Sequence, residues 1–477
     1  MAEKSPAAVH KISVFHLMMI STAFIIGVRT FPIMAEVGLQ MIFFNFIAAI
    51  AYLVPVALVS AELATGWPKQ GGIYAWVKEA FGERWGFFAI WLQWIQMIFA
   101  GVAILSFIAG SLAYVYDPEL AKNKIFVLVV ILAVYWGLTF ANLFGMKISG
   151  LISTVCLICG VFLPSGLLFV FSLIYLLGGN TIHIDMSFTA HNMIPKITDI
   201  QGLVLLGGFI LGYAGLEVSA VHANHVKNPS RDYPVAIFAA GIIVFVLYIL
   251  GGLAVAIVVP QKDLSLIAGI METFAVIFNK YHISWLIPFV AILAGFGAIG
   301  QSSTWIVGPA KGLLITAESG DLPPLFQKVN KHGVPIAFLI LQASLISLFG
   351  LLYLFIPSIN ASYWMMVDLA VMLYLIMYAL MFLAAIRLRY TKPDVHRAYR
   401  VPGGKAGMLS CAGIGLLTSV FIFFVGFFPP EQLKTGSVFF YDLFLGLGVL
   451  AMVAVPMIIY HFRKPSWIKQ RTDITES

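Results

Sequence analysis

The chain has 477 residues, of which 61% are hydrophobic and only 10% are charged, with a mean hydropathy of +0.97. A soluble domain carries about 25% charged residues, so this chain cannot cover a water-facing surface of its size. The composition therefore excludes a soluble protein and predicts one whose solvent is largely lipid.

Long apolar runs follow one another along the whole chain. One membrane crossing by a helix needs roughly 20 mostly apolar residues. Twelve such runs lie near residues 14–35, 40–62, 86–116, 125–142, 150–178, 201–222, 234–259, 284–317, 335–357, 363–388, 407–429 and 438–461. They do not alternate like the ~10-residue strands of a transmembrane barrel, so they predict helices. The first run and the run at 284–317 contain interruptions.

The net charge of +7 is explained by topology rather than by an anionic partner such as nucleic acid. If both termini are cytoplasmic, most Lys and Arg residues fall in inner segments, as the positive-inside rule requires. The outer loops then hold Lys122, Lys124, Lys196, Lys262, Lys280 and Lys434.

The polar segments are too short to form a soluble domain. We expect a cytoplasmic N-terminus over 1–13, a ten-helix core over 14–390, a basic cytoplasmic loop over 391–406, two helices over 407–461 and a short cytoplasmic tail over 462–477. The first run lacks a signal-peptide cleavage site and is expected to be a retained span. Cys156 and Cys159 form a C-x-x-C within an apolar run, where packing is favoured over redox or metal chemistry.

Two apolar runs are interrupted by glycine beside a charged residue. The first run contains Gly27 and Arg29, and the run at 201–222 contains Gly215 and Glu217. Paired interrupted segments in corresponding positions indicate an inverted-repeat transporter with its site at the breaks. Broken helices expose N–H and C=O groups that need polar partners in the membrane. The alternative interpretation is that these glycines merely allow close helix packing.

Four ionisable residues of interest lie inside the predicted spans: Arg29, Glu62, Glu217 and Asp368. A charge at the bilayer centre costs roughly 2.5–3.5 kcal/mol on insertion scales, which makes each one a candidate for function. Arg29 either binds an acidic substrate group or pairs with a helix acid, unless it extends to the membrane surface. Glu217 either carries a coupled proton or anchors the break by hydrogen bonds. An interfacial or structural role is favoured for Glu62, and Asp368 is expected near an outer vestibule.

Three aromatic residues stand out from a background of 39 Phe, 18 Tyr and 10 Trp. Trp305 follows a polar patch at 301–304, and Tyr374 and Tyr378 are four residues apart and so share a helix face. Such rings can close over an ammonium group by cation–π contact. For any single ring, packing is the commoner role.

Several segments together carry a family resemblance. They are Ala61, Glu62 and Leu63 with Pro68, Gly71, Gly72, Tyr74 and Trp76, then the stretches 215–217, 228–234, 305–309, 330–335 and 402–405. These segments resemble the amino acid–polyamine–organocation superfamily and, within it, the bacterial glutamate:GABA antiporter family. The likeness extends over the chain to about residue 460.

The resemblance implies an all-α polytopic membrane protein with twelve transmembrane helices. Ten of them would form a LeuT-like inverted repeat of five plus five, with discontinuous helices 1 and 6. The resemblance also implies a bacterial inner membrane location and small amino acid substrates. It implies no cofactor, no metal and no catalytic residue. A homodimer is left open.

The resemblance further implies which residues contact substrate. Family transporters hold the α-carboxylate and α-amino groups on the exposed backbone of helices 1 and 6. The matching positions here are Ile25, Ile26, Gly27, Leu211, Gly212 and Ala214. Trp305 matches the helix 8 tryptophan that gates or contacts substrate, Tyr374 and Tyr378 match paired helix 10 tyrosines, and Glu217 matches the helix 6 acid.

Two features depart from the family pattern. Helix 1 lacks the common Gly-Ser-Gly core, and Arg29 stands where a tyrosine is expected. Arg29 is therefore added to the predicted substrate-binding residues. The tail after residue 460 is short, so gating by a C-terminal plug is not expected.

We predict a secondary active antiporter that exchanges glutamate or a related amino acid for GABA or a similar amine by alternating access. The alternative is a proton-coupled symporter for a neutral or cationic amino acid; Ser302, Ser303 and Thr304 keep sodium coupling open. An intramembrane enzyme would need clustered His, Asp or Glu residues in the spans, and the sequence has no H-E-x-x-H motif. A sensor that binds without transport is a third alternative.

Overall fold

The computed structural model describes residues 12–68, 71–144, 155–156, 158–196, 200–219, 226–430, 433 and 437–468, and this part of the chain is built of helices. Within it, ten helices are long and apolar enough to cross a membrane, and a bent pair near the N-terminus raises the number to eleven. A shorter apolar helical stretch covers Leu206–Val218 and is divided between Tyr213 and Leu216. The prediction of an all-α polytopic membrane protein is confirmed.

The helices follow the predicted apolar runs. In chain order they are α1 (Val14–Ile25), α2 (Phe31–Ala35), α3 (Gln40–Ala48), α4 (Val54–Gly66), α5 (Ile73–Phe81), α6 (Glu83–Tyr116), α7 (Lys124–Leu143), α9 (Leu163–Leu177), α10 (Ala190–Met193), α11 (Ile200–Leu203), α12 (Leu206–Tyr213), α13 (Leu216–Ser219), α14 (Pro229–Val258), α15 (Gly269–Lys280), α16 (Ile287–Glu318), α17 (Ile336–Gly350), α18 (Leu352–Phe355), α19 (Ile359–Thr391), α20 (Gly404–Val425) and α21 (Val438–His461).

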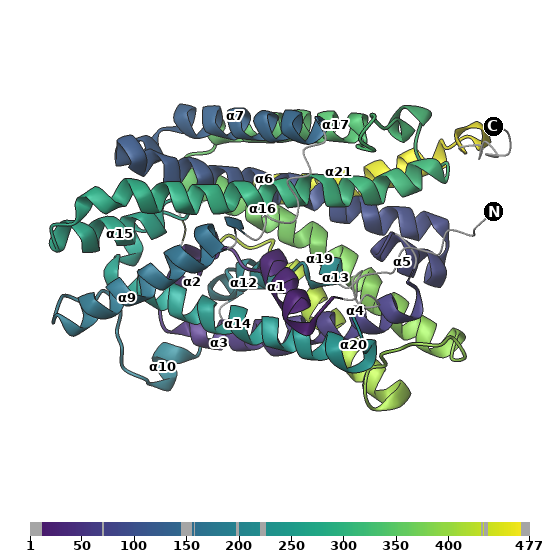
Figure 1. Cartoon of the computed structure of the whole chain (residues 1–477), viewed down its shortest axis with the longest axis horizontal. Coiled ribbons are helices and arrows are strands. Elements are labelled where there is room, and N and C mark those ends of the chain that lie inside the picture. The colour runs from purple at the N-terminus through teal and green to yellow at the C-terminus, as the bar shows by residue number, and fades with distance from the viewer. Residues whose placement is uncertain are drawn as a thin grey trace, which may run out of the picture.

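The long helices run roughly parallel to one another in Figure 1, with the short helices α1, α12 and α13 near the middle of the view. The long helix α6 packs along α16 and α19, and most of its side chains are buried. α5 and the C-terminal end of the chain lie at the right of the view, and α15 lies at the left. The bundle therefore has two distinct ends and a buried middle.

Proline shapes two of the spans without breaking them. A π-helical turn at Ala49–Leu53 comes just before Pro55, and another at Ile158–Phe162 comes just before Pro164. Proline has no N–H and its ring collides with the carbonyl four residues back, and a π turn gives the chain the extra room. The interruption expected in the run at 284–317 is not present, because α16 continues unbroken from Ile287 to Glu318.

The helix α16 packs unusually closely on the segment before α9. A methyl group added at Gly160 would lie 2.0 Å from the Gly297 Cα, so the two backbones touch. Cys156 fills the space beside Gly300, where an added methyl group would lie 2.4 Å from its sulfur. Small residues allow this close approach between helices in a membrane. Cys156 therefore serves as a packing residue in this contact.

A buried ion cluster closes one end of the bundle. Glu62 of α4 accepts a hydrogen bond from Arg389 Nη1 at 2.6 Å and lies 3.2 Å from Arg397 Nε. The Val401 N–H also donates to Glu62 at 2.7 Å. The basic segment predicted at 391–406 thus folds back onto the end of α4, and the structural role favoured for Glu62 agrees with these contacts.

Asp368 does not face an outer vestibule, so that expectation was wrong. Its side chain is 1% exposed and accepts a hydrogen bond from the Tyr441 hydroxyl at 2.5 Å. Tyr441 lies on α21, which packs against α19 and covers this position. The carboxyl group is therefore enclosed between helices.

At the end of the bundle opposite the ion cluster, α15 covers the end of α2. Gly269 of α15 lies so close to Pro32 that an added methyl group would be 3.1 Å from the proline ring. Gln261 donates a hydrogen bond to the Glu36 carbonyl at 2.7 Å. Burial raises the pKa of the Glu36 carboxyl to about 8, and repulsion from Glu272 of α15 adds to this effect. Burial also raises the pKa of Glu272 to about 7.

The raised pKa of Glu36 predicts a pH-dependent stability. A carboxyl whose pKa rises on folding contributes stability below its unfolded value, near 4.5, and this stability is lost as the pH rises through about 8. We therefore expect Glu36→Gln to raise the melting temperature in detergent at pH 9 and to change it little at pH 5. The control is Glu119→Gln, because Glu119 is exposed and paired with Lys122. An equal rise in melting temperature at both pH values would contradict the ionisation of a buried Glu36 carboxyl at high pH.

Candidate functional site

The first predicted helix break is present. α1 ends at Ile25, and Gly27 is extended, with φ of −146° and ψ of 120°. A 3-10 turn over Val28–Thr30 then leads into α2, and the two halves of this span meet at 47°. The break exposes the last carbonyl groups of α1 and the first N–H groups of the following turn, which have no partner within a helix.

The second predicted break is also present. α12 ends at Tyr213 and α13 begins at Leu216, with Gly215 between them at a φ of +111°. This backbone conformation is open to glycine and strained for other residues. Gly215 thus sets the position of the break, as its place in the sequence predicted.

Side chains from two other helices bond the carbonyl groups that the breaks expose. The Tyr248 hydroxyl of α14 lies 3.1 Å from the Ile25 oxygen and 2.9 Å from the Gly212 oxygen, so it bridges both broken helices. Gln301 of α16 donates to the Ile26 oxygen at 3.0 Å. Sequence reasoning did not single out Tyr248, and it treated Gln301 only as part of a polar patch. The sequence feature that could have identified both residues is a polar side chain inside an apolar run.

Arg29 turns back toward the break rather than out to the membrane surface. Its Nη1 donates to Gln301 Oε1 at 2.7 Å, and the guanidinium lies against Gly27, where an added methyl group would be 2.3 Å from Nη1. In the part of the chain that the structure describes, no carboxylate forms an ion pair with Arg29. Since Gln301 is neutral, the Arg29 charge remains available to a ligand.

A central cavity of about 30 Å³ lies between the two breaks. Its walls come from the broken helices and from α6, α16 and α19, and they comprise Ile25, Arg29, Gln96, Met97, Ala100, Ile104, Leu211, Ala214, Trp305 and Tyr374. This volume has room for about two water molecules. An amino acid needs more space, so the helices must move apart to admit one.

Most of the predicted site residues meet at this central cavity. Ile25, Arg29, Leu211, Ala214, Trp305 and Tyr374 line it. Gly212 lines a neighbouring cavity of about 10 Å³, to which Arg29 and Leu211 also contribute. Ile26, Gly27, Glu217 and Tyr378 lie outside the lining of both cavities.

Glu217 lies behind the cavity wall, with donors on both carboxylate oxygens. Gln93 Nε2 at 3.0 Å and the Tyr374 hydroxyl donate to Oε1, and the Tyr378 hydroxyl donates to Oε2. Tyr378 also accepts the Gly215 N–H at 3.0 Å. Glu217 therefore ties α13 to α6 and α19 beside the second break.

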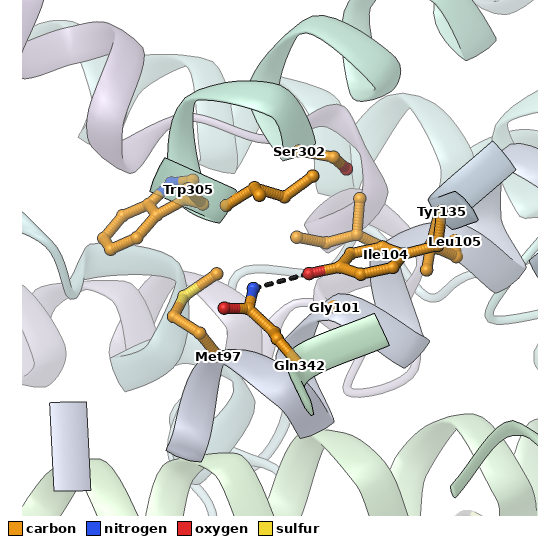
Figure 2. Close-up of a pocket in the computed structure, with 9 residues that line it drawn as sticks. Met97, Gly101, Ile104, Leu105, Tyr135, Ser302, Trp305 and Gln342 are labelled. Carbon is orange, nitrogen blue, oxygen red and sulfur yellow. Dashed lines mark hydrogen bonds between the residues drawn. The ribbon is translucent and has the colours of Figure 1, made fainter. Parts of the chain in front are cut away.

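Another small cavity, of about 10 Å³, lies beyond Trp305 (Figure 2). Figure 2 shows Trp305 on one side of it and Tyr135 on the other. The Tyr135 hydroxyl accepts a hydrogen bond from Gln342 Nε2 at 2.5 Å, and Gln342 Oε1 accepts one from Trp94 Nε1 at 2.9 Å. Three residues line both this cavity and the central one and so stand between the two spaces: Met97, Ile104 and Trp305.

Comparison with known proteins finds relatives that are transporters. A relative from Legionella pneumophila, described as an uncharacterized transporter, is 39% identical over 447 residues, which is 94% of this chain and 96% of the relative. Glutamate/gamma-aminobutyrate antiporters of Lactococcus lactis subspecies lactis and cremoris are 36% and 35% identical over 456 residues, covering 94% of this chain and 90% of each relative. These relatives are transporters and not enzymes.

A family model described as amino acid permease matches residues 12–450. The match covers both broken helices, the central cavity and nearly every span. The chain therefore belongs to the amino acid permease family of multi-pass membrane transporters.

Proposed function

We propose that this protein is a secondary active antiporter that exchanges glutamate, or a related amino acid, for GABA or a similar amine by alternating access. The observation that carries the proposal is the position of Arg29, which lines the central cavity at the helix breaks while its guanidinium is bonded to a neutral amide. The two glutamate/gamma-aminobutyrate antiporters at about 36% identity support the same substrate pair.

The geometry offers two places for carboxylate groups. The first N–H groups of the turn at Val28–Thr30 carry partial positive charge, which suits a substrate carboxylate. Arg29 offers a planar fork of donors to a second carboxylate. Glutamate has two carboxylates and GABA has one, so Arg29 is the residue that would distinguish them.

We also propose that the end of the bundle with the ion cluster faces the cytoplasm. This end holds Arg84, Arg389, Lys392, Arg397 and Arg463, and the positive-inside rule assigns such an end to the cytoplasmic side. The C-terminal end of the chain lies here in Figure 1. Both termini would then be cytoplasmic in a bacterial inner membrane.

The broken helices support a transport core of five plus five helices in inverted repeat over 14–390. Ten long spans, the bent pair and the helix at Leu206–Val218 are the elements that such a core and two further helices require. Discontinuous helices are found where transporters of this architecture bind substrate. Residues 407–461 would supply the two further helices.

Transport by purified protein in liposomes tests the function directly. Vesicles are loaded with unlabelled glutamate, with GABA or with no amino acid, and uptake of radiolabelled glutamate is followed from pH 5 to pH 8. We expect uptake to require an internal amino acid. Uptake into empty vesicles that is driven by a proton gradient would instead establish a symporter, and absence of glutamate uptake would contradict the proposed substrate.

Removal of the Arg29 charge should separate the two substrates. We expect Arg29→Gln to weaken glutamate exchange at least tenfold, because a charge-assisted hydrogen bond contributes about 1.5–3 kcal/mol and about 1.4 kcal/mol is a factor of ten. Exchange of GABA for GABA should change less, since GABA lacks the second carboxylate. Arg84→Gln is the control, because Arg84 lies at the exposed end of α6. Equal effects on the two substrates would contradict the role of Arg29 in selection.

Glu217 should behave as an anchor and not as a proton carrier. We expect Glu217→Gln to keep exchange and its pH profile, because an amide fits the same space and the neighbouring hydroxyls can donate or accept. Glu217→Leu should lower the melting temperature in detergent, because Gln93, Tyr374 and Tyr378 would lose a buried partner. Loss of pH dependence in Glu217→Gln would instead show that Glu217 carries a coupled proton.

A further inference from the structure

We infer that Gln96 binds the ammonium group of the substrate and thereby makes the site selective for acids that carry an amino group. This inference rests on the proposed function, since it concerns the same cavity. It assigns a role to a residue of α6 that lies outside both broken helices.

Gln96 is a buried side chain with an unused acceptor. It is 1% exposed and lines the central cavity. Its Nε2 donates to the Gln93 carbonyl oxygen at 3.2 Å, whereas its Oε1 has no hydrogen-bond partner among the described residues. Buried polar atoms are nearly always paired in folded proteins, so an orphan acceptor in a cavity wall indicates a missing donor.

The orientation of the Gln96 amide is fixed by its neighbour. If the amide were rotated by half a turn, Oε1 would face the Gln93 carbonyl oxygen and two acceptors would repel each other. The observed orientation keeps Nε2 on that carbonyl. Oε1 is therefore the atom of Gln96 that is left for a ligand.

Gln96 adds a further acceptor to the carbonyl groups that the breaks expose. The Ile25 and Gly212 oxygens lie within hydrogen-bond distance of the Tyr248 hydroxyl, and the Ile26 oxygen accepts from Gln301. The Tyr248 hydroxyl has a single proton and can serve only one of its two oxygens at a time, whereas Gln96 Oε1 has no donor at all among the described residues. Gln96 therefore gives the site an acceptor on α6 in addition to the carbonyl oxygens of the breaks.

The cavity lining has two chemical poles that fit an amino acid. Arg29 supplies the positive charge, and none of the described residues that line the cavity is Asp or Glu. A neutral acceptor such as Gln96 can bind an ammonium group without repelling the substrate carboxylates. The Trp305 and Tyr374 rings also line the cavity and can face a cation. The ligand class is therefore an α- or ω-amino acid, and the matching acid without an amino group should bind poorly.

Substrate analogues that differ by the amino group test this inference. For each amino acid that the wild type exchanges in liposomes, inhibition is compared with that of its deamino analogue, for example glutamate with glutarate and GABA with butyrate. We expect the wild type to prefer the amino acid. Gln96→Leu keeps the volume and removes the acceptor, so it should reduce that preference at least tenfold, mainly through KM. Gln96→Glu keeps an acceptor and should retain the preference.

Gln342→Leu is the matched control, because Gln342 is a buried glutamine whose amide is bonded at both ends to Trp94 and Tyr135. It should leave the preference between analogues unchanged. If Gln96→Leu does not yield folded protein, Gln96→Met removes the acceptor with an unbranched side chain. Two results would overturn this inference without affecting the proposed function. One is an unchanged preference for the amino acid in a folded Gln96→Leu or Gln96→Met variant. The other is a loss of that preference in Gln96→Glu as large as in Gln96→Leu. A wild type that exchanges no amino acid would overturn the proposed function and this inference together.

Discussion

The structure depends on satisfying the backbone of two helices that are broken inside a membrane. A polar group without a partner costs several kcal/mol in hydrocarbon, so each break can exist only if other helices supply donors. Tyr248 and Gln301 supply them for the carbonyl groups at the first break. Gln301 also accepts from Arg29, so the amide that satisfies the backbone also holds the guanidinium at the cavity. The chemistry of the site therefore follows from the support of the break.

The two breaks are supported by different means. The first is held by neutral side chains, and Arg29 is the one charged side chain among the described residues that line the central cavity. The second is held by Glu217, whose carboxylate accepts hydrogen bonds from the hydroxyl groups of Tyr374 and Tyr378. Tyr374 belongs to both systems, because its ring lines the cavity while its hydroxyl is bonded behind it. Through Tyr374 the cavity wall is joined directly to the anchor of the second break.

The sequence was sufficient to predict an all-α polytopic membrane protein and both breaks, because apolar run length and glycine beside a charge are local signals. It could not show Gln96 or Tyr248 as site residues, since nothing local says which helices meet at a break. Asp368 was misplaced for the same reason, because Tyr441, which covers it, lies 73 residues further along the chain. The polar patch at 301–304 does not interrupt α16, because polar side chains leave the backbone hydrogen bonds of a helix intact.

The contact between Gly160 and Gly297 has a mechanical consequence. Two backbones that touch leave no room for a larger side chain at either glycine, and such a side chain would push them apart. Gln301 lies about one helical turn beyond Gly297, and Trp305 one turn beyond that. We therefore expect the segment around Gly160 and α16 to move together as one rigid unit. Gln301, which supports the first break, and Trp305, which lines the cavity, would move with this unit.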